Sequence, residues 1–400
     1  MAIQTLLAAR IFDGSGADAI EDGFVRFEDG RIRDIGRRAD LGSAAAGARD
    51  LGDATILPGL INMHTHLTCS GSMDVLGDAL NDSYEVKMMR AVENARASLL
   101  SGVTTIRDCG TLNDIVFSIR EASKRGLITA PHVWASGEVL TSTGGHCWFF
   151  GVECDSNDEV RRAVRRQVKA GADFVKVMSS GGGLTPNSNP TASQFTREDM
   201  IAIVEDSARL GRYVASHCHG TGSVYNSVAA GVRTIEHCSF WEPSGINYHQ
   251  DAIDGVVEKG IYICPTLGVG ERLRQEQLAA GVTDAYGPMR TGRIDNLRRM
   301  HASGVKFVSG NDAGMVKTGF DDFQLDIELL VELIGLSPAE AILTATGQAA
   351  EALGNVDFGV LAPGKRADIL AVRGNALHDV GALRDLLLVI KSGQTFVDRV

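Results

Sequence analysis

The chain has 400 residues, of which 44% are hydrophobic and 22% are charged, and its formal net charge is −11. This composition is typical of a folded globular protein and excludes the disordered and fibrous classes. The acidic balance, with no run of Lys and Arg to offset it, argues against a nucleic-acid partner and against an anionic membrane surface.

Both ends of the chain differ in pattern from its middle. Residues 1–58 contain short alternating stretches separated by Gly and Asp turns, such as TLLAARIF, GFVRFEDG and RIRDIG. The same style returns near the C-terminus in ADILAVRG, LLLVIKSG and QTFVDRV. Such alternation is typical of short antiparallel strands. We therefore predict a small β-sandwich domain built from residues 1–58 and 359–400, beside a larger domain of residues 59–358.

The middle of the chain repeats one unit, a short apolar strand followed by a stretch with helical periodicity. Eight strands are predicted, at residues 60–66, 103–110, 132–140, 174–180, 213–219, 234–238, 262–267 and 306–312. Asn157, Thr196 and Ser337 are the expected helix N-caps, because an acidic residue follows each of them within three positions. This alternation predicts an α/β fold with a (β/α)8 TIM barrel. The competing doubly wound sheet is disfavoured because no G-x-G-x-x-G motif follows the first strand.

The cysteines and the apolar runs bear on the compartment. Seven cysteines are present, with no Cys-x-x-Cys motif. An odd number in a chain of this size predicts reduced thiols and a cytoplasmic location. No signal peptide or membrane span is expected, because the N-terminus lacks a basic segment and no apolar run approaches about 18 residues.

Unusual polar residues occur where several predicted strands end, which is the face of a barrel that carries function. These residues are His64, His66, Lys176, His217, His219, His237 and Asp312. Because residues i and i+2 of a strand point to the same side, His64 and His66 can bind one ion together. Imidazole nitrogens suit zinc or a similar divalent metal. A lone histidine is more often an ordinary core residue, but this clustering favours a metal site.

Lys176 lies between Val175 and Val177 in a strand that is predicted to be buried on both faces. A buried ammonium without a partner is unfavourable. One explanation is an ion pair with Glu138 or Asp312. The other is a reaction with carbon dioxide, which would make the side chain an anionic carbamate that bridges two metals. The residues alone leave both explanations open.

Taken together, the motifs PGLINMHTHL, FVKVM, SHCHG, TIEHC, GNDAG and GVLAPGKRADILAVRGN resemble the metal-dependent amidohydrolase superfamily over nearly the whole chain. The chain is most similar to the branch of imidazolonepropionase-related proteins and Xaa-Pro or Xaa-Arg dipeptidases and carboxypeptidases. That branch also holds ochratoxin- and phenylurea-hydrolysing enzymes. Asn311 is a departure, since the family more often has Thr before the aspartate.

The resemblance implies two divalent metal ions, usually zinc, and a small-molecule substrate. His64, His66 and Asp312 would bind one ion, and His217 and His237 the other. Lys176, as N6-carboxylysine, would bridge them. His219 would then lie beside the ligands or contact the substrate, and homo-oligomers are expected in this branch.

The expected reaction is hydrolysis of an amide bond in a dipeptide or N-acyl amino acid, with a cyclic amide, urea or carbamate as the alternative. Asp312 would transfer protons, and His146, in STGGHCWFF, would stabilise the oxyanion. Two other classes are disfavoured: a metal-free binding protein, because all six ligands are present, and a mononuclear deaminase, because of Lys176.

Weaker candidates lie in the loops after the strands. Residues 179–195 form a Gly-, Pro- and Ser-rich segment that is expected to cover the substrate rather than to bind phosphate. Tyr225 is a candidate contact for a substrate carboxylate. The remaining candidates are Trp148, Phe149 and Phe150 as a pocket wall or rim, and Arg272, Arg274 and Arg293 as acid-binding or solvated cations. Cys218 and Cys238 are expected to point away from the ions.

Overall fold

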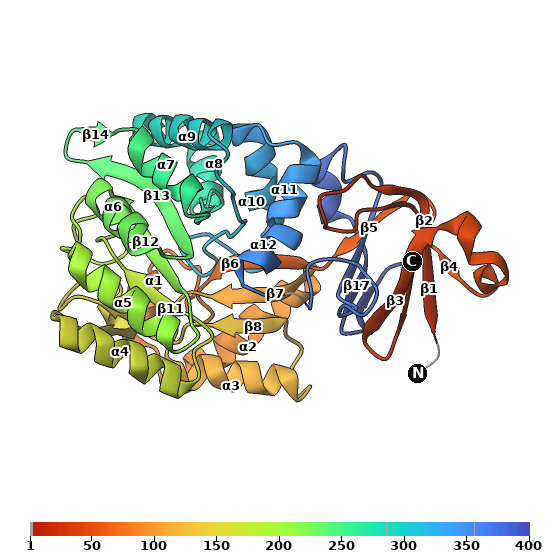
Figure 1. The fold of residues 1–400 in the computed structure, drawn as a ribbon, viewed down its shortest axis with the longest axis horizontal. Coiled ribbons are helices and arrows are strands. Elements are labelled where there is room, and N and C mark those ends of the chain that lie inside the picture. The colour runs from red at the N-terminus through yellow and green to blue at the C-terminus, as the bar shows by residue number, and fades with distance from the viewer. Residues whose placement is uncertain (1–2, 285–286, 356) are drawn as a thin grey trace.

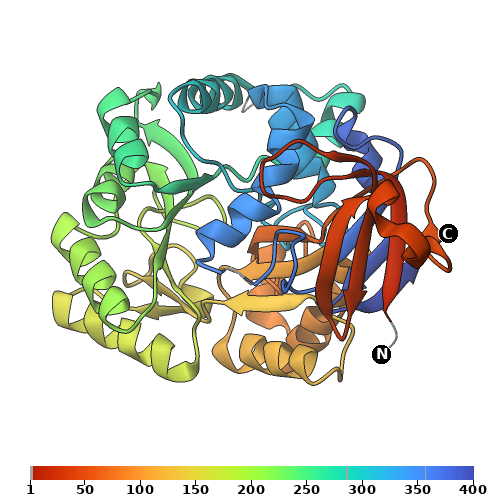
Figure 2. The same cartoon turned by 45° about the vertical axis from the view of Figure 1, so that its right-hand side comes forward.

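A computed structural model describes residues 3–284, 287–355 and 357–400. The fold is mixed α/β, with strands and helices alternating through the middle and both chain ends meeting in a separate region (Figure 1). Helices lie on the outside of the central strands (Figures 1 and 2). No helix within the described ranges is both long and apolar enough to cross a lipid bilayer.

The chain ends form one eight-stranded sheet in the order β18–β17–β16–β5–β1–β2–β3, with β4 paired to β1. The strands are β1 (Gln4–Ile11), β2 (Ile20–Glu28), β3 (Arg31–Arg37), β4 (Arg49–Asp50), β5 (Ala54–Pro58), β16 (Ile369–Arg373), β17 (Leu386–Lys391) and β18 (Gln394–Asp398). Figure 2 shows the N-terminal and C-terminal strands side by side. The two ends do pair, but this single sheet does not confirm a two-sheet sandwich, and the domain limits stay a prediction.

The alternation of side chains along each strand determines which face of this terminal sheet packs against the central region. Along β16, Leu370 and Val372 belong to the large core of the central region, whereas Ile369 and Ala371 belong to a separate core within the terminal sheet. Successive side chains of a strand point to opposite faces, so one face of the sheet packs on the rest of the molecule.

The central strands fall into two sheets. They are β6 (Leu60–Thr65), β7 (Val103–Asp108), β8 (His132–Ala135), β9 (Val139–Thr141), β10 (Gly151–Glu153), β11 (Val175–Met178), β12 (Val214–Gly220), β13 (Thr234–Glu242), β14 (Gly245–Ile246) and β15 (Tyr262–Cys264). The order is β6–β7–β8 in one sheet and β10–β9–β11–β12–β13 in the other, with β14 and β15 both paired to β13. All these pairs are parallel except β13–β14. Parallel strands alternating with helices agree with the predicted fold class.

Two of the predicted strands differ in the structure. Residues 132–140 are divided between β8 and β9. Residues 306–312 form no regular strand, and the nearby backbone makes only the single bridges Ile263–Phe307 and Thr65–Ala313. The central sheets therefore do not form one closed ladder. At the end of this segment Asp312 has φ 61°, a left-handed conformation that an extended strand does not have.

Helices follow most of the central strands. They are α1 (Val75–Asn81), α2 (Tyr84–Leu100), α3 (Asn113–Lys124), α4 (Asn157–Ala170), α5 (Arg197–Arg209), α6 (Thr221–Ala230), α7 (Gln250–Glu258), α8 (Glu271–Ala279), α9 (Gly287–Ala302), α10 (Gln324–Leu329), α11 (Pro338–Thr344) and α12 (Gly347–Ala352). Thr196 and Ser337 are N-caps, as predicted, and each forms a capping box. The prediction for Asn157 was wrong by one residue, because Ser156 accepts the capping hydrogen bond from the Glu159 N–H.

Candidate metal centre and active site

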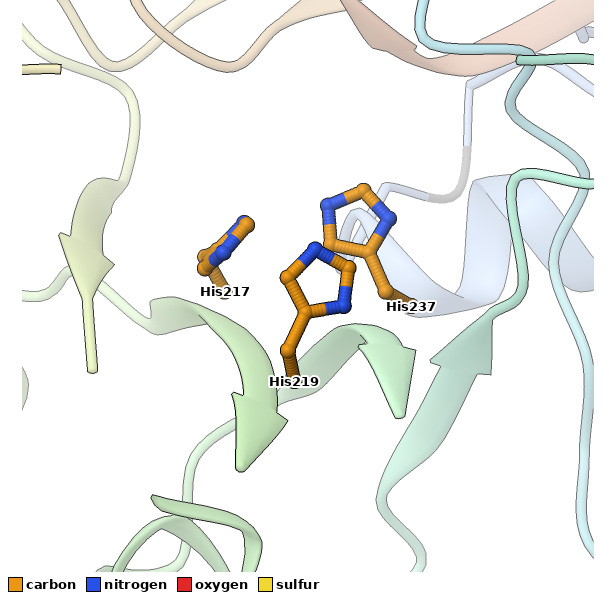
Figure 3. A group of neighbouring side chains, drawn as sticks. All are labelled: His217, His219 and His237. Atoms are coloured by element: carbon orange, nitrogen blue, oxygen red, sulfur yellow. The ribbon is translucent and has the colours of Figure 1, made fainter. Parts of the chain in front are cut away.

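The predicted polar residues converge on one cavity of about 530 Å³. Its lining includes His64, His66, His146, Lys176, His217, His219, His237, Arg293 and Asp312. They come from β6, β11, β12 and β13, from the loops that follow strands and, for Arg293, from α9. Figure 3 shows the rings of His217 and His219, from β12, grouped with that of His237, from β13. The structure thus brings together every metal-ligand candidate named from the sequence.

Asp312 lies between His64, in β6, and His66, which directly follows β6. Its Oδ1 atom is 3.5 Å from His64 Nε2 and 3.3 Å from His66 Nε2. His64, His237 and Asp312 have possible ligand atoms within 4.8 Å of one another, and so do His217, His219 and His237. These two groups of donors overlap at His237. In the second group, His219 lies as close to His217 and His237 as these two expected ligands lie to each other, within 4.8 Å.

Hydrogen bonds on the far side of each ring decide which nitrogen faces the cavity. His64 Nδ1 lies 2.9 Å from Glu236 Oε2, and His66 Nδ1 lies 2.9 Å from the Gly110 carbonyl oxygen. These oxygens only accept, so Nδ1 carries a hydrogen, and in the neutral ring Nε2 keeps its lone pair. His217 is reversed, because its Nε2 lies 3.2 Å from the Gly181 carbonyl oxygen and Nδ1 is left free.

His237 follows the same logic through a hydroxyl group. Its Nδ1 lies 2.7 Å from Thr266 Oγ1, and that hydroxyl donates to the Pro265 carbonyl oxygen at 2.7 Å. The Thr266 oxygen therefore accepts from Nδ1, which leaves Nε2 of His237 free. His237 also has φ 68°, and strained backbone at a non-glycine residue is typical of functional sites.

Burial keeps most of these imidazoles neutral. It lowers the pKa of His64 to about 4, with a further contribution from Lys176, and it holds the pKa values of His217 and His237 well below their usual range. His66 is the exception: the Asp312 carboxylate outweighs burial and raises its pKa. Neutral imidazole is the form that binds metals.

Lys176 has no hydrogen-bond or close ion-pair partner among the described residues, although the Asp312 and Glu236 carboxylates act on its charge from a distance. Its side chain is 1% exposed, and Nζ makes no hydrogen bond. Glu138 instead accepts from Asn113 and Arg166, and no described carboxylate lies within 4.0 Å of Nζ. The ion-pair explanation therefore finds no support. A buried amine without a partner, in the same cavity as free imidazole nitrogens, fits a lysine that is carboxylated to bridge two metals.

His146 lies in the same cavity, and its ring centroid is 4.6 Å from that of His217. Burial lowers the pKa of His146 to about 3. Thr185 Oγ1 accepts from the Cys147 N–H at 2.9 Å, so the hydroxyl proton can be donated to His146 Nδ1, 3.1 Å away. This arrangement leaves Nε2 as a hydrogen-bond donor. A Cβ atom at Gly182 would lie 2.4 Å from that Nε2, so the glycine-rich loop makes room for this ring.

An ion pair beneath the site was missed in the sequence. Arg107 and Glu236 are fully buried, and Arg107 Nη2 lies 2.7 Å from Glu236 Oε1. Arg107 also donates to the Met63 carbonyl oxygen at 2.6 Å, and the other Glu236 oxygen accepts from His64. Burial opposes ionisation, but Arg107 and His64 hold the pKa of Glu236 well below its usual value. Arg107 and Glu236 are each a charged residue within a predicted strand, which is the same signal that singled out Lys176.

Replacing Arg107 by methionine is expected to lower the free energy of unfolding by about 3–5 kcal/mol, because Glu236 would keep a buried charge without its partner. Urea denaturation followed by circular dichroism measures this loss. Arg165→Met is the matched control, because the Arg165 side chain is 55% exposed. Its partner Asp206 would still form ion pairs with Arg161 and Arg209 in this variant. The control should change stability by less than about 1 kcal/mol. Equal losses of stability in the two variants would contradict the stabilising role of the buried Arg107–Glu236 pair.

Some candidates lie elsewhere. Tyr225 does not line this cavity: its hydroxyl bonds Asp251 and His249 at the start of α7, and its contact with a substrate stays a prediction. The face that Tyr225 occupies on α6 turns it toward the neighbouring helix. Trp148 is 43% exposed, which fits the rim rather than a wall.

Three further predictions are decided by contacts. Phe150 packs against the ring of His66, with centroids 5.7 Å apart. Arg272 and Arg274 are paired with Asp322 and Glu271. Cys218 and Cys238 are buried and, as expected, do not line the cavity; all seven cysteines are free.

Comparison with known proteins agrees with the resemblance seen in the motifs. The model of the amidohydrolase family matches residues 55–395. Ochratoxinase from Aspergillus niger is 28% identical over 377 residues, covering 85% of this chain and 75% of that protein. Imidazolonepropionase from Paracoccus denitrificans is 24% identical over 395 residues, covering 89% of each chain. A crystal structure of a Xaa-Pro dipeptidase with bound methionine superimposes with a TM-score of 0.86 at 28% identity, covering 99% of this chain and 100% of that one. The protein is a hydrolase that acts on carbon–nitrogen bonds, and it belongs to the amidohydrolase family.

Proposed function

We propose that the protein is a binuclear metal-dependent amidohydrolase that cleaves the amide bond of a dipeptide or N-acyl amino acid. The observation that carries the proposal is the partnerless, buried Nζ of Lys176, in the same cavity as imidazoles whose hydrogen bonds leave one nitrogen free. A divalent metal site needs neutral imidazoles and anionic oxygens. Asp312 supplies one anionic oxygen, and carboxylation of Lys176 would supply others.

The ligands divide into two sets. His64, His66 and Asp312 would hold one ion, and His217 and His237 the other. The Lys176 amine would react with carbon dioxide, forming a nitrogen–carbon bond and releasing a proton, to give N6-carboxylysine between the two ions. This reaction replaces a buried cation by an anion among metal ligands, which removes the unfavourable charge. Zinc is the proposed metal because the donor set is imidazole and carboxylate.

The residues of the cavity have distinct roles in hydrolysis. When bound, two divalent ions supply Lewis acidity and lower the pKa of water. Asp312 accepts a proton from the attacking water and passes it to the leaving nitrogen. His146 donates from Nε2 to the carbonyl oxygen as negative charge develops there. His219 stacks on Trp241, with ring centroids 4.5 Å apart, and we assign it to substrate contact.

The same residues would serve a cyclic amide, a urea or a carbamate, including xenobiotic compounds. The relatives favour keeping this alternative, because imidazolonepropionase and ochratoxinase match alongside the Xaa-Pro dipeptidase. A panel of dipeptides, N-acyl amino acids, cyclic amides and aryl ureas separates the two classes by relative kcat/KM.

Elemental analysis of protein purified without chelator tests the metal site. About two zinc-like ions per chain are expected, because two overlapping sets of free donors are present. Removing the ions with a chelator should abolish hydrolysis, and adding metal with bicarbonate should restore it. One ion per chain would favour a mononuclear site. A metal-free protein that stays inactive after this addition would contradict the proposal.

A further inference from the structure

A cavity of about 450 Å³ lies where the terminal sheet meets the central region. One side is lined by the end of α3 and the loop that leads to β8, and the other by the turn between β17 and β18. His132, which lines the cavity, is the first residue of β8, whereas the metal-ligand candidates lie where the parallel strands end. No residue that lines the metal cavity also lines this one. The two cavities are therefore separate sites.

The lining of this cavity is basic, although the chain as a whole has a net charge of −11. Lys124, Lys391 and His132 line it, and no Asp or Glu of the described residues does. Gln394 lies opposite Lys391 across the turn between β17 and β18, and it adds an amide group that can donate a hydrogen bond. The cavity therefore offers a ligand cationic groups and hydrogen-bond donors without a carboxylate to repel an anion.

Lys391 is the buried cation of this lining, with 8% of its surface exposed. Its Nζ donates to Ser123 Oγ at 3.0 Å and to the Ala130 carbonyl oxygen at 2.7 Å. Both acceptors are neutral, and no carboxylate of the described residues lies within 4.0 Å of Nζ. Burial lowers the pKa of Lys391 to about 8, so the amine is still mostly protonated at neutral pH. An ammonium group has three N–H bonds, so one remains for a ligand.

The charged groups around Lys391 do not balance it. The Asp368 carboxylate acts on Lys391 from a distance, but its oxygens accept from Arg366 Nε at 2.6 Å and from the Ser392 N–H at 2.7 Å. Arg366 Nη2 has no hydrogen-bond partner among the described residues. Burial lowers the pKa of His132, so this ring is neutral at neutral pH. The cluster therefore holds two cations and one carboxylate, which leaves one positive charge uncompensated.

A buried cation that lines a cavity without a counter-charge favours the binding of an anion. One excess positive charge matches a monocarboxylate better than a phosphate group, which carries up to two negative charges at neutral pH. The cavity also has an apolar wall of Leu127, Ile128 and Phe396, and Leu127 is 65% exposed, so a ligand chain could cover it. We propose that this cavity binds a small monocarboxylate with an apolar chain, whose carboxylate contacts Lys391 and whose chain packs on Leu127. The proposal does not depend on the reaction at the metal site.

Calorimetric titration of the metal-loaded protein at neutral pH tests this site with four probes. Hexanoate carries both recognised groups, 1-hexanol lacks the carboxylate, acetate lacks the chain, and inorganic phosphate is the competing anion. Hexanoate is expected to bind at least about tenfold more tightly than 1-hexanol, because the alcohol cannot compensate the buried cation. Acetate is expected to bind at least about tenfold more weakly than hexanoate, since it leaves the apolar wall uncovered. Equal affinities for hexanoate and 1-hexanol, or tighter binding of phosphate than of hexanoate, would overturn the proposal.

The variant Lys391→Met should weaken hexanoate binding at least about tenfold and change the affinity for 1-hexanol by less than about threefold. Methionine fills a similar space, and Ser123 would still donate to the Pro131 carbonyl oxygen. Lys124→Met is the matched control: it removes the exposed lysine of the same lining and should change hexanoate affinity by less than about threefold, because an exposed charge is hydrated and screened. Hexanoate held by the metal ions would bind wild type and Lys391→Met equally, and that result would overturn the proposal.

A second variant, Leu127→Ala, tests the apolar wall without a buried change, because most of the Leu127 side chain is exposed. It should weaken hexanoate binding about threefold or more, since the shortened side chain buries less apolar surface with the ligand. Acetate affinity should stay the same, because acetate does not reach this side chain. Hexanoate affinity equal to that of wild type in Leu127→Ala would contradict the assignment of the chain to this wall.

Discussion

Replacing Lys176 by alanine is expected to reduce hydrolysis by about a thousandfold or more and to lower the metal content to one ion per chain or fewer. The reason is that the carboxylated side chain would be the bridging ligand, and Asp312 is the one acidic residue of the described chain that shares a group of possible ligand atoms with both His64 and His237. Elemental analysis and initial rates on the same preparation measure both effects. Stability should not fall by the usual amount for a core truncation, because the apo form loses a buried amine that has no partner.

Two variants make the Lys176 result specific. Lys306→Ala removes an exposed lysine paired with Glu351, and it should leave metal content and rate unchanged. Lys176→Glu restores a carboxylate at position 176, so it should retain more metal than Lys176→Ala. Full metal content and normal activity in Lys176→Ala would refute the carbamate.

Changing Asp312 to asparagine is expected to lower kcat by about 10²- to 10⁴-fold, because an amide cannot accept the proton of the attacking water. The side chain keeps its size, so the fold should not change. In the protein without metal, His64 and His66 outweigh burial and hold the pKa of Asp312 below its usual range, so the wild-type group is ionised at neutral pH. Steady-state kinetics with metal content measured in parallel gives the result.

The parallel metal measurement separates the two roles of Asp312. If the loss comes from proton transfer, a preparation of Asp312→Asn with its metal restored by excess zinc stays inactive. If the loss comes only from a missing ligand, excess zinc restores turnover. Normal hydrolysis by Asp312→Asn would exclude both roles.

Much of the site was predictable from short-range rules. Parallel strands end at a common edge and side chains alternate with period two, so His64, His66, His217 and His237 could be expected together from strand positions alone. The N-caps Thr196 and Ser337 were equally local, because a capping box involves only residues three positions apart. Asn157 shows the limit, since the adjacent Ser156 competes for the same role and geometry decides between them.

Residues whose contacts are made with a different helix or strand could not be assigned from the sequence. Tyr225 satisfies the pattern for a loop-proximal contact, but the packing of α6 on α7 gives its hydroxyl to Asp251. Arg107 and Glu236 are far apart in the sequence and pair only because β7 and β13 are brought near each other beneath the cavity. Residues 306–312 make only the single bridge Ile263–Phe307 instead of a regular eighth strand, because ladder pairing depends on the neighbouring strand and not on the segment alone.

The sequence by itself determined the kinds of donor and the strand ends that carry them, because both follow from residue type and from the alternation of side chains along a strand. Only the tertiary structure decided which nitrogen of each histidine faces the cavity, since that depends on an acceptor from a different segment, such as Glu236 for His64 or Gly181 for His217. It also decided that Arg272 and Arg274 are paired with carboxylates, whereas no carboxylate of the described residues lies within 4.0 Å of the Arg293 guanidinium nitrogens. An unpaired charge is a property of the whole surroundings of a group, and those surroundings exist only in the folded chain.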